Sequence, residues 1–101
     1  MGENKELRLP AKERLILELL SSTGPLFGMR LVELSDGQLK RGTVYVTLAR
    51  MEAKGYLQSE QEEAVPAAIG LPRRIYRTTP RGEHVLRLWT TIARELAWEA
   101  T

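Results

Sequence analysis

The stretch that most constrains the fold is residues 41–57, RGTVYVTLARMEAKGYL, which carries the periodicity of one amphipathic helix. Val44, Leu48 and Met51 recur at i, i+4 and i+7, so they share one stripe of a helix with 3.6 residues per turn. Gly55 stands where a left-handed residue commonly ends a helix. The sequence therefore predicts a short helix with one buried face and a glycine at its end.

The opposite face of this helix is small, hydroxylated and basic. Thr43, Thr47 and Arg50 lie there with Val46 between them, in place of the Glu and Lys mixture of an ordinary solvated face. Such a face suits a DNA groove, and we favour this interpretation over plain exposure. Arg50 is long enough to reach either a guanine edge or a phosphate, and both alternatives stay open. Val46 is expected either to touch a thymine methyl or to pack against the protein.

Two helical patterns precede this stretch. The segment Pro10–Leu20 predicts a core helix with a broad apolar stripe and with Glu13 outside it. A short helix from about Gly28 to Ser35 is expected to turn Leu31, Val32 and Leu34 inward, and Asp36–Gly37 is typical of a turn. These helices are expected to support the longer pattern that follows them.

After this region the pattern changes to a period of two, which is typical of strands. Residues 56–61 predict a strand that leaves the core, residues 64–72 predict a loop, and residues 73–78, RRIYRT, predict the returning strand. A hairpin directly after such a helix is typical of the wing of a winged helix. Thr79–Pro80 then predicts the start of a final helix, with threonine as N-cap and proline as first residue.

The final helix carries more apolar surface than a chain of 101 residues can cover. Val85, Trp89, Ile92 and Leu96 form a seam, and Leu86 widens it. We expect these residues to form the interface of a homodimer. Trp89 is also a candidate for holding a small hydrophobic or aromatic effector, although plain interface packing is favoured.

The net charge of +2 says little about partners, but the charges are clustered. Basic residues gather at positions 40–50 and 73–81, and acidic residues gather at positions 60–63. A basic surface with the acids elsewhere is typical of a protein that binds phosphate while staying near neutral. The start of the helix predicted within residues 41–57, beside Lys40 and Arg41, is expected to hold a phosphate oxygen on its backbone N–H groups.

Several classes of protein are excluded by composition and motif. The chain has no cysteine, which excludes disulfide scaffolds and thiolate metal sites, and no run of about 18 apolar residues, which excludes a membrane span. The start lacks the pattern of a secretory signal, so a cytoplasmic protein is expected. A lone histidine, His84, supports neither a metal site nor catalysis. We expect no enzyme activity, no cofactor and no metal.

Motifs spread along most of the chain, in the right order, resemble the PadR family of bacterial winged-helix transcriptional regulators. They are LILELL, the Phe27–Gly28 pair, GTVYVTLARMEAKGYL and GLPRRIYRTTPRG. The resemblance implies a dimeric repressor whose last helix carries dimerisation, often relieved by a small molecule or another cue. Because the chain ends soon after Ala97, it also implies a short form with a single C-terminal helix. Thr78 departs from the family pattern, since an apolar residue is usual there.

We therefore expect a mainly α (α+β) fold, a winged helix-turn-helix with a two-stranded β wing and a long C-terminal dimerisation helix. Residues 1–9 are expected to form a flexible arm, residues 10–79 the DNA-binding domain and residues 80–101 the dimerisation helix. The expected function is sequence-specific transcriptional regulation, as a dimeric repressor on a pseudo-palindromic operator in double-stranded DNA. The alternative is a winged-helix interaction module that docks on an acidic protein. The residues expected to contact DNA are Lys40, Arg41, Thr43, Tyr45, Thr47, Arg50, Arg73 and Arg74.

Overall fold

The computed structural model describes residues 8–62 and 73–100. Most of the expected N-terminal arm and the expected wing loop, including Pro72, lie outside the described residues. The described elements, in chain order, are α1 (Ala11–Thr23), β1 (Leu26–Phe27), α2 (Gly28–Leu34), α3 (Val44–Ala53), β2 (Leu57–Gln61), β3 (Arg74–Thr78) and α4 (Pro80–Ala100). The expected mainly α fold with a small antiparallel sheet is confirmed.

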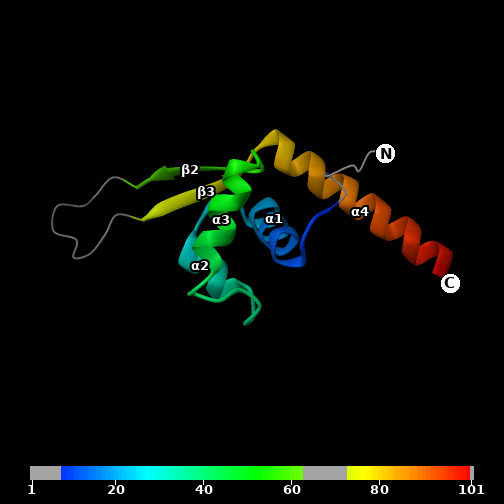
Figure 1. Cartoon of the computed structure of the whole chain (residues 1–101), viewed down its shortest axis with the longest axis horizontal. Coiled ribbons are helices and arrows are strands. Elements are labelled where there is room, and N and C mark those ends of the chain that lie inside the picture. Colours follow the sequence, from blue (N-terminus) through cyan, green and yellow to red (C-terminus); the bar gives the residue numbers. More distant parts are fainter. Residues whose placement is uncertain (1–7, 63–72, 101) are drawn as a thin grey trace.

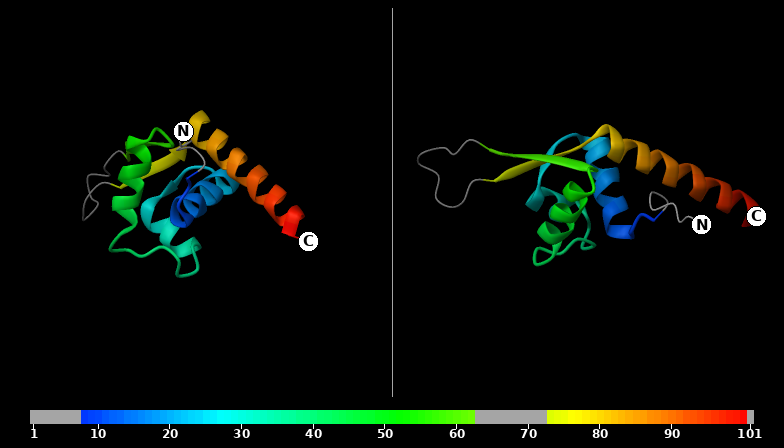
Figure 2. Two further views of the ribbon diagram at one scale, coloured as in Figure 1. Left: turned by 45° about the vertical axis from the view of Figure 1, so that its right-hand side comes forward. Right: turned by 45° about the horizontal axis from the view of Figure 1, so that its top comes forward.

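The helices α1, α2 and α3 form a central body from which the β2–β3 hairpin and α4 project in opposite directions (Figure 1). The strands β2 and β3 extend away on one side, and α4 extends away on the other, as the turned views in Figure 2 also show. With 21 residues α4 is about 30 Å long. In the described part of the chain no helix is long and apolar enough to cross a membrane.

The expected two-stranded wing is formed by β2 and β3, and β1 adds a third strand to the sheet, in the order β1-β3-β2. Leu26 pairs with Tyr76, and Phe27 pairs with Ile75. Strand β1 was not predicted, because a two-residue strand has no periodicity of its own and exists only through its partner. The antiparallel pairing of β2 with β3 continues the sheet toward the predicted wing.

The core contains residues from every helix and from the sheet. Leu9, which was assigned to the flexible arm, is only 8% exposed and packs in this core. An apolar residue just before α1 gains more from burial than from solvation. The buried hydrophobic residues are Leu9, Ile16, Leu17, Leu20, Leu31, Leu39, Val44, Leu48, Met51, Tyr56, Leu57, Tyr76 and Val85.

Two expectations about the early helices were wrong. Glu13, predicted to lie outside the apolar stripe, is 1% exposed because its carboxylate accepts hydrogen bonds from the Lys54 ammonium. Leu34, predicted to face inward, is 37% exposed. In the seven-residue α2 the contact with the core is made by Leu31 and Val32, and Leu34 ends the helix at its outer side.

The end of α3 and the start of α4 lie against each other, and the caps of both are as predicted. Gly55 has φ +82°, its N–H donates to Glu52 O, and the Tyr56 N–H donates to Met51 O, which together make a Schellman cap. The Thr79 hydroxyl accepts a hydrogen bond from the Gly82 N–H at 3.0 Å, as an N-cap does. These caps fix where the wing leaves the body and where α4 begins.

Candidate nucleic-acid interface

The two faces of α3 differ as predicted. Val44, Leu48 and Met51 are at most 1% exposed and hold the helix on the core. On the outer side Val46 is 59% exposed, and Arg50 is also exposed. The helix therefore presents a solvent-facing surface that another molecule can reach without disturbing the core.

The start of α3 differs from the prediction. The helix begins at Val44, and the three residues before it form a turn in which the Thr43 and Val44 N–H groups both donate to Lys40 O, at 3.1 and 2.9 Å. These two N–H groups are therefore not available to a phosphate, contrary to expectation. Thr43 has φ −126°, outside helical geometry, which delays the first turn. The side chains of Lys40 and Arg41, like that of Thr43, are exposed.

Two residues of the predicted DNA-contacting set are partly engaged by the protein itself. Thr47 is half-buried, and its hydroxyl lies 3.4 Å from Thr43 O. Tyr45 is 46% exposed, and its ring edge lies against the start of α2. The contact is so close that a Cβ at Gly28 would lie 2.6 Å from ring atom Cε1. The glycine thus allows α2 and α3 to approach closely and leaves part of the Tyr45 ring at the surface.

Arg73 and Arg74 point to opposite faces of the sheet, as alternation along a strand requires. The Arg74 Nε–H donates to the Ser59 hydroxyl at 3.1 Å, and that hydroxyl donates to the Glu52 carboxylate at 2.9 Å. Since Glu52 belongs to α3, this chain of hydrogen bonds joins the returning strand of the wing to the central helix. Arg74 therefore lies on the face of the sheet that turns toward α3.

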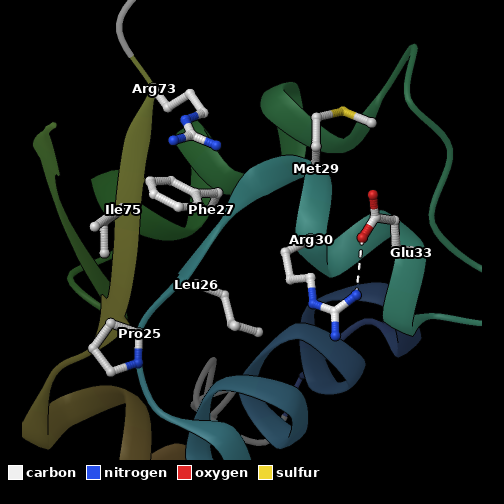
Figure 3. A pocket seen from close by; sticks show the side chains of 8 residues that line it. All are labelled: Pro25, Leu26, Phe27, Met29, Arg30, Glu33, Arg73 and Ile75. Atoms are coloured by element: carbon white, nitrogen blue, oxygen red, sulfur yellow. Dashed lines mark hydrogen bonds and ion pairs between the residues drawn. The ribbon is translucent and has the colours of Figure 1, made fainter. Parts of the chain in front are cut away.

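Arg73 lies on the other face of the sheet, together with Phe27 and Ile75 (Figure 3). Its guanidinium carbon stands 4.1 Å from the centroid of the Phe27 ring, a cation–π contact. Its Nε and Nη2 both approach Oε1 of Glu62 at 3.1 Å. Arg73 is thus oriented by an aromatic ring beneath it and by a carboxylate at one edge.

A shallow groove of about 430 Å³ opens beside this arginine, between the edge of the sheet and α2 (Figure 3). Its floor is apolar, and at its α2 side Arg30 pairs with Glu33 at 2.9 Å. The groove is separate from Trp89, the residue proposed to hold an effector. The lining residues are Pro25, Leu26, Phe27, Met29, Arg30, Glu33, Arg73 and Ile75.

A buried phenol lies beneath the Arg74 side of the wing. Burial of Tyr76, which is 5% exposed, raises its pKa above 10.0, while the nearby Arg74 lowers it and Glu52 and Tyr45 raise it further. The net direction is upward, so Tyr76 is neutral at physiological pH. It supports the interface as an apolar ring and contributes no charge to it.

The acidic residues near the wing do not stand apart from the basic ones, which corrects the expected separation of charge. Glu62 pairs with Arg73, and Glu60 pairs with Arg77 at 2.8 Å. The roles of Ser59 and Glu52, which join the hairpin to α3, were not predicted. The sequence contains acidic residues on one strand and basic residues on the other. It does not reveal the register of the two strands, which decides which acid meets which arginine.

The predicted seam of α4 is only partly at the surface. Val85 is 0% exposed within the single chain, so it belongs to the core of its own subunit and is removed from the predicted dimer interface. Leu86 and Trp89 are half-buried against the same core, with the Arg14 guanidinium 5.4 Å from the Trp89 ring centroid. Further along, Ile92 is half-buried and Leu96 is 63% exposed. The outward part of the seam therefore lies toward the C-terminal end of α4.

Thr78, which departs from the family pattern, makes a polar contact instead of an apolar one. Its hydroxyl donates to Glu83 at 2.6 Å, and the other carboxylate oxygen of Glu83 accepts from Ser21 at 3.1 Å. The carboxylate thus connects β3, α1 and α4. Among residues 8–62 and 73–100, no group of three or more His, Cys, Asp or Glu side chains is placed to hold a metal ion.

Comparison with known proteins agrees with this architecture. The family model described as the transcriptional regulator PadR-like family matches residues 16–88. The chain is 45% identical over 58 residues to the transcriptional regulator Rv3488 of Mycobacterium tuberculosis, and the match covers 57% of this chain and 50% of that protein. The match therefore spans half the length of this curated relative.

Two solved structures share the fold. A PadR-like transcription factor from Bacteroides fragilis has a TM-score of 0.76 at 25% identity, with 88% of this chain and 85% of that chain covered. Bacillus subtilis PadR, solved in complex with operator DNA, has a TM-score of 0.70 at 21% identity, with 82% and 48% covered. The second likeness bears on the fold alone.

Proposed function

The chain belongs to the PadR-like family of transcriptional regulators, and we propose that it is a dimeric repressor that binds a pseudo-palindromic operator through α3 and the β2–β3 hairpin. One observation carries the proposal: the outer face of α3 is exposed and basic, and Glu52 of the same helix is joined through Ser59 to Arg74 of the hairpin. A helix and a hairpin held in one frame can engage one DNA duplex together. Bacillus subtilis PadR, which has this fold, was solved with operator DNA.

Recognition of the operator divides between two kinds of contact. Thr43, Thr47 and Arg50 are proposed to read base edges in the major groove, where an arginine can donate two hydrogen bonds to one guanine. The backbone contacts are proposed to come from Lys40 and Arg41 before α3, with Tyr45 adding its hydroxyl. On the wing, Arg74 and Arg73 are proposed to bind phosphates on the two faces of the hairpin.

Dimerisation is proposed to use the outward part of the α4 seam, with Ile92 and Leu96 at its centre and Leu86 and Trp89 at its inner edge. A twofold dimer places the two copies of α3 on half-sites about one helical turn, roughly 34 Å, apart or a multiple of it. In this proposal residues 10–79 form the DNA-binding unit and residues 80–101 the dimerising unit. Trp89 stays the candidate for holding a small hydrophobic or aromatic effector, with plain packing of its ring as the favoured alternative. Binding to chromosomal DNA would place the protein in the cytoplasm.

The direct test is a gel shift of the purified protein on DNA from upstream of its own gene, with a random duplex of equal length as the control. Selective binding that weakens steeply between about 50 and 200 mM salt supports the proposal. Equal affinity for both duplexes at every salt concentration contradicts it. That outcome would favour docking on an acidic protein by the same surface.

A further inference from the structure

The basic residues of the wing and those of α3 are in different electrostatic states. Arg73 and Arg77 each lie within 3.1 Å of a carboxylate of their own chain, from Glu62 and Glu60 respectively. By contrast, the guanidinium groups of Arg41 and Arg50 have no hydrogen bond or ion pair within the described part of the chain. Arg41, just before α3, and Arg50 within it therefore face solvent with their full charge, whereas Arg73 and Arg77 of the wing are already countered by carboxylates.

Glu62 is placed to counter the wing arginine at the end of the hairpin farthest from α4. Its N–H donates to the Arg73 carbonyl at 2.6 Å, so the two residues stand opposite each other where the described part of the hairpin ends. The Phe27 ring covers one face of the guanidinium, and Glu62 occupies its Nε–Nη2 edge. A phosphate that approaches Arg73 from that edge meets the negative charge of Glu62 first.

We propose that Glu62 limits the affinity of the protein for DNA, because its carboxylate occupies Arg73 and keeps phosphate away from it. Arg73 becomes available only when docking of α3 brings the DNA backbone within hydrogen-bonding distance. This inference rests on the proposed function. An exposed ion pair is weak, so a phosphate held nearby by α3 can displace the carboxylate. A phosphate that meets the Arg73 face of the wing without α3 has only the neutral pairs Arg73–Glu62 and Arg77–Glu60 to attract it. The wing therefore adds little to binding on random DNA and engages after α3.

The matched control lies on the same face of the same sheet. Glu60→Gln removes the same charge as Glu62→Gln, but its partner Arg77 stands four residues further along β3, about 13 Å from Arg73. That separation exceeds the Debye length of about 8 Å at physiological salt. A general effect of net charge would appear in both variants, whereas a local effect on Arg73 would appear only in Glu62→Gln.

The experiment measures binding of a fluorescein-labelled random duplex and of DNA from upstream of the gene between about 50 and 200 mM salt. Glu62→Gln is expected to bind the random duplex several-fold more tightly at the lowest salt. Its plot of log K against log salt should be steeper by about 0.9, equivalent to one added phosphate contact. Glu60→Gln should change the slope by less than half as much. The Glu62→Gln effect should disappear in the Arg73→Ala background.

Unchanged or weaker binding of Glu62→Gln to the random duplex would overturn the inference, as would an equal gain in Glu60→Gln or a gain that persists without Arg73. Each variant is compared with the wild type by thermal unfolding, so that loss of fold is separated from loss of binding. If the wild type binds neither duplex, the proposed function itself fails. If the wild type binds selectively and Glu62→Gln matches it, only this inference fails.

Discussion

The Lys54 ammonium lies 2.9 and 3.0 Å from the two carboxylate oxygens of Glu13, and this contact joins the end of α3 to the first turn of α1. The Glu13 side chain is 2% exposed and the Lys54 side chain 36%. A carboxylate so deeply buried is stable only with a partner. The pair therefore holds the proposed recognition helix on the body of the protein.

Replacement of Lys54 should leave the buried carboxylate without its partner. We expect Lys54→Met to lower the free energy of unfolding by about 1–3 kcal/mol, less than for a fully buried pair because water reaches this end of the contact. Glu13→Gln combined with Lys54→Met should recover part of this loss, since no charge is then stranded. Urea unfolding of the wild type, Lys54→Met and the double variant measures the free energy of unfolding of each. A double variant no more stable than Lys54→Met would contradict the assignment.

The junction between α3 and α4 should be intolerant of a single methyl group. A Cβ at Gly82 would overlap the Tyr56 carbonyl oxygen, which is backbone and cannot move alone. We expect Gly82→Ala to destabilise the protein by roughly 1–3 kcal/mol or more, as overpacking does. Gly42→Ala is the control, because nothing lies within 4 Å of its Cβ position. Equal unfolding midpoints for the two variants would show that the junction is looser than described.

Much of the secondary structure follows from signals that are local in sequence. The stripe of α3, the left-handed Gly55 and the Thr79–Pro80 start of α4 each depend on residues within one or two helical turns. Periodicity and capping act over that range, and so the elements appear where they were predicted. The start of α3 was misplaced because helix ends are defined by a few weak hydrogen bonds.

The features that were missed depend on partners far away in the sequence. Strand β1 exists through its pairing with β3, about 50 residues later, and Glu13 is buried because Lys54 meets it from α3. The pairing of Glu62 with Arg73 depends on the register of the hairpin. Val85 was assigned to the dimer because a helical seam does not reveal where the subunit's own core ends. The exposed face of α3 could be predicted, but the state of the wing cations could not.

The dimer proposal predicts a charge-sensitive position on α4. Leu96→Glu places a carboxylate in the proposed apolar interface, and we expect it to convert the dimer to a monomer without loss of helix content. Thr91→Glu makes the same change of charge at an exposed position off the seam and should leave the dimer intact. Sedimentation velocity with circular dichroism checks both. A dimer that survives Leu96→Glu, or a wild type that is monomeric, would contradict the proposed interface.

The buried phenol of Tyr76 predicts a loss of stability in alkali. Because its pKa is raised in the folded state, the folded protein retains this proton at pH values where the unfolded chain has lost it. The stability that the neutral Tyr76 phenol contributes is complete below about pH 10, and it is lost as the pH rises through the folded pKa of Tyr76. Tyr76→Phe should therefore lose less stability than the wild type above pH 10. Urea unfolding of both proteins from pH 8 to 11 measures this. An equal loss of unfolding free energy in the two proteins would contradict the assignment.

The most direct test of the central claim, that the outer face of α3 reads bases, is the ratio of affinities for operator and random DNA in Arg50→Ala. We expect the loss of a base contact to lower this ratio roughly 5- to 150-fold, equivalent to about 1–3 kcal/mol of discrimination free energy. The salt dependence of binding should change little. Arg74→Ala, which removes a proposed phosphate contact, should weaken binding to both duplexes alike and flatten the salt slope by about one. An Arg50→Ala variant that keeps the wild-type ratio would contradict the account.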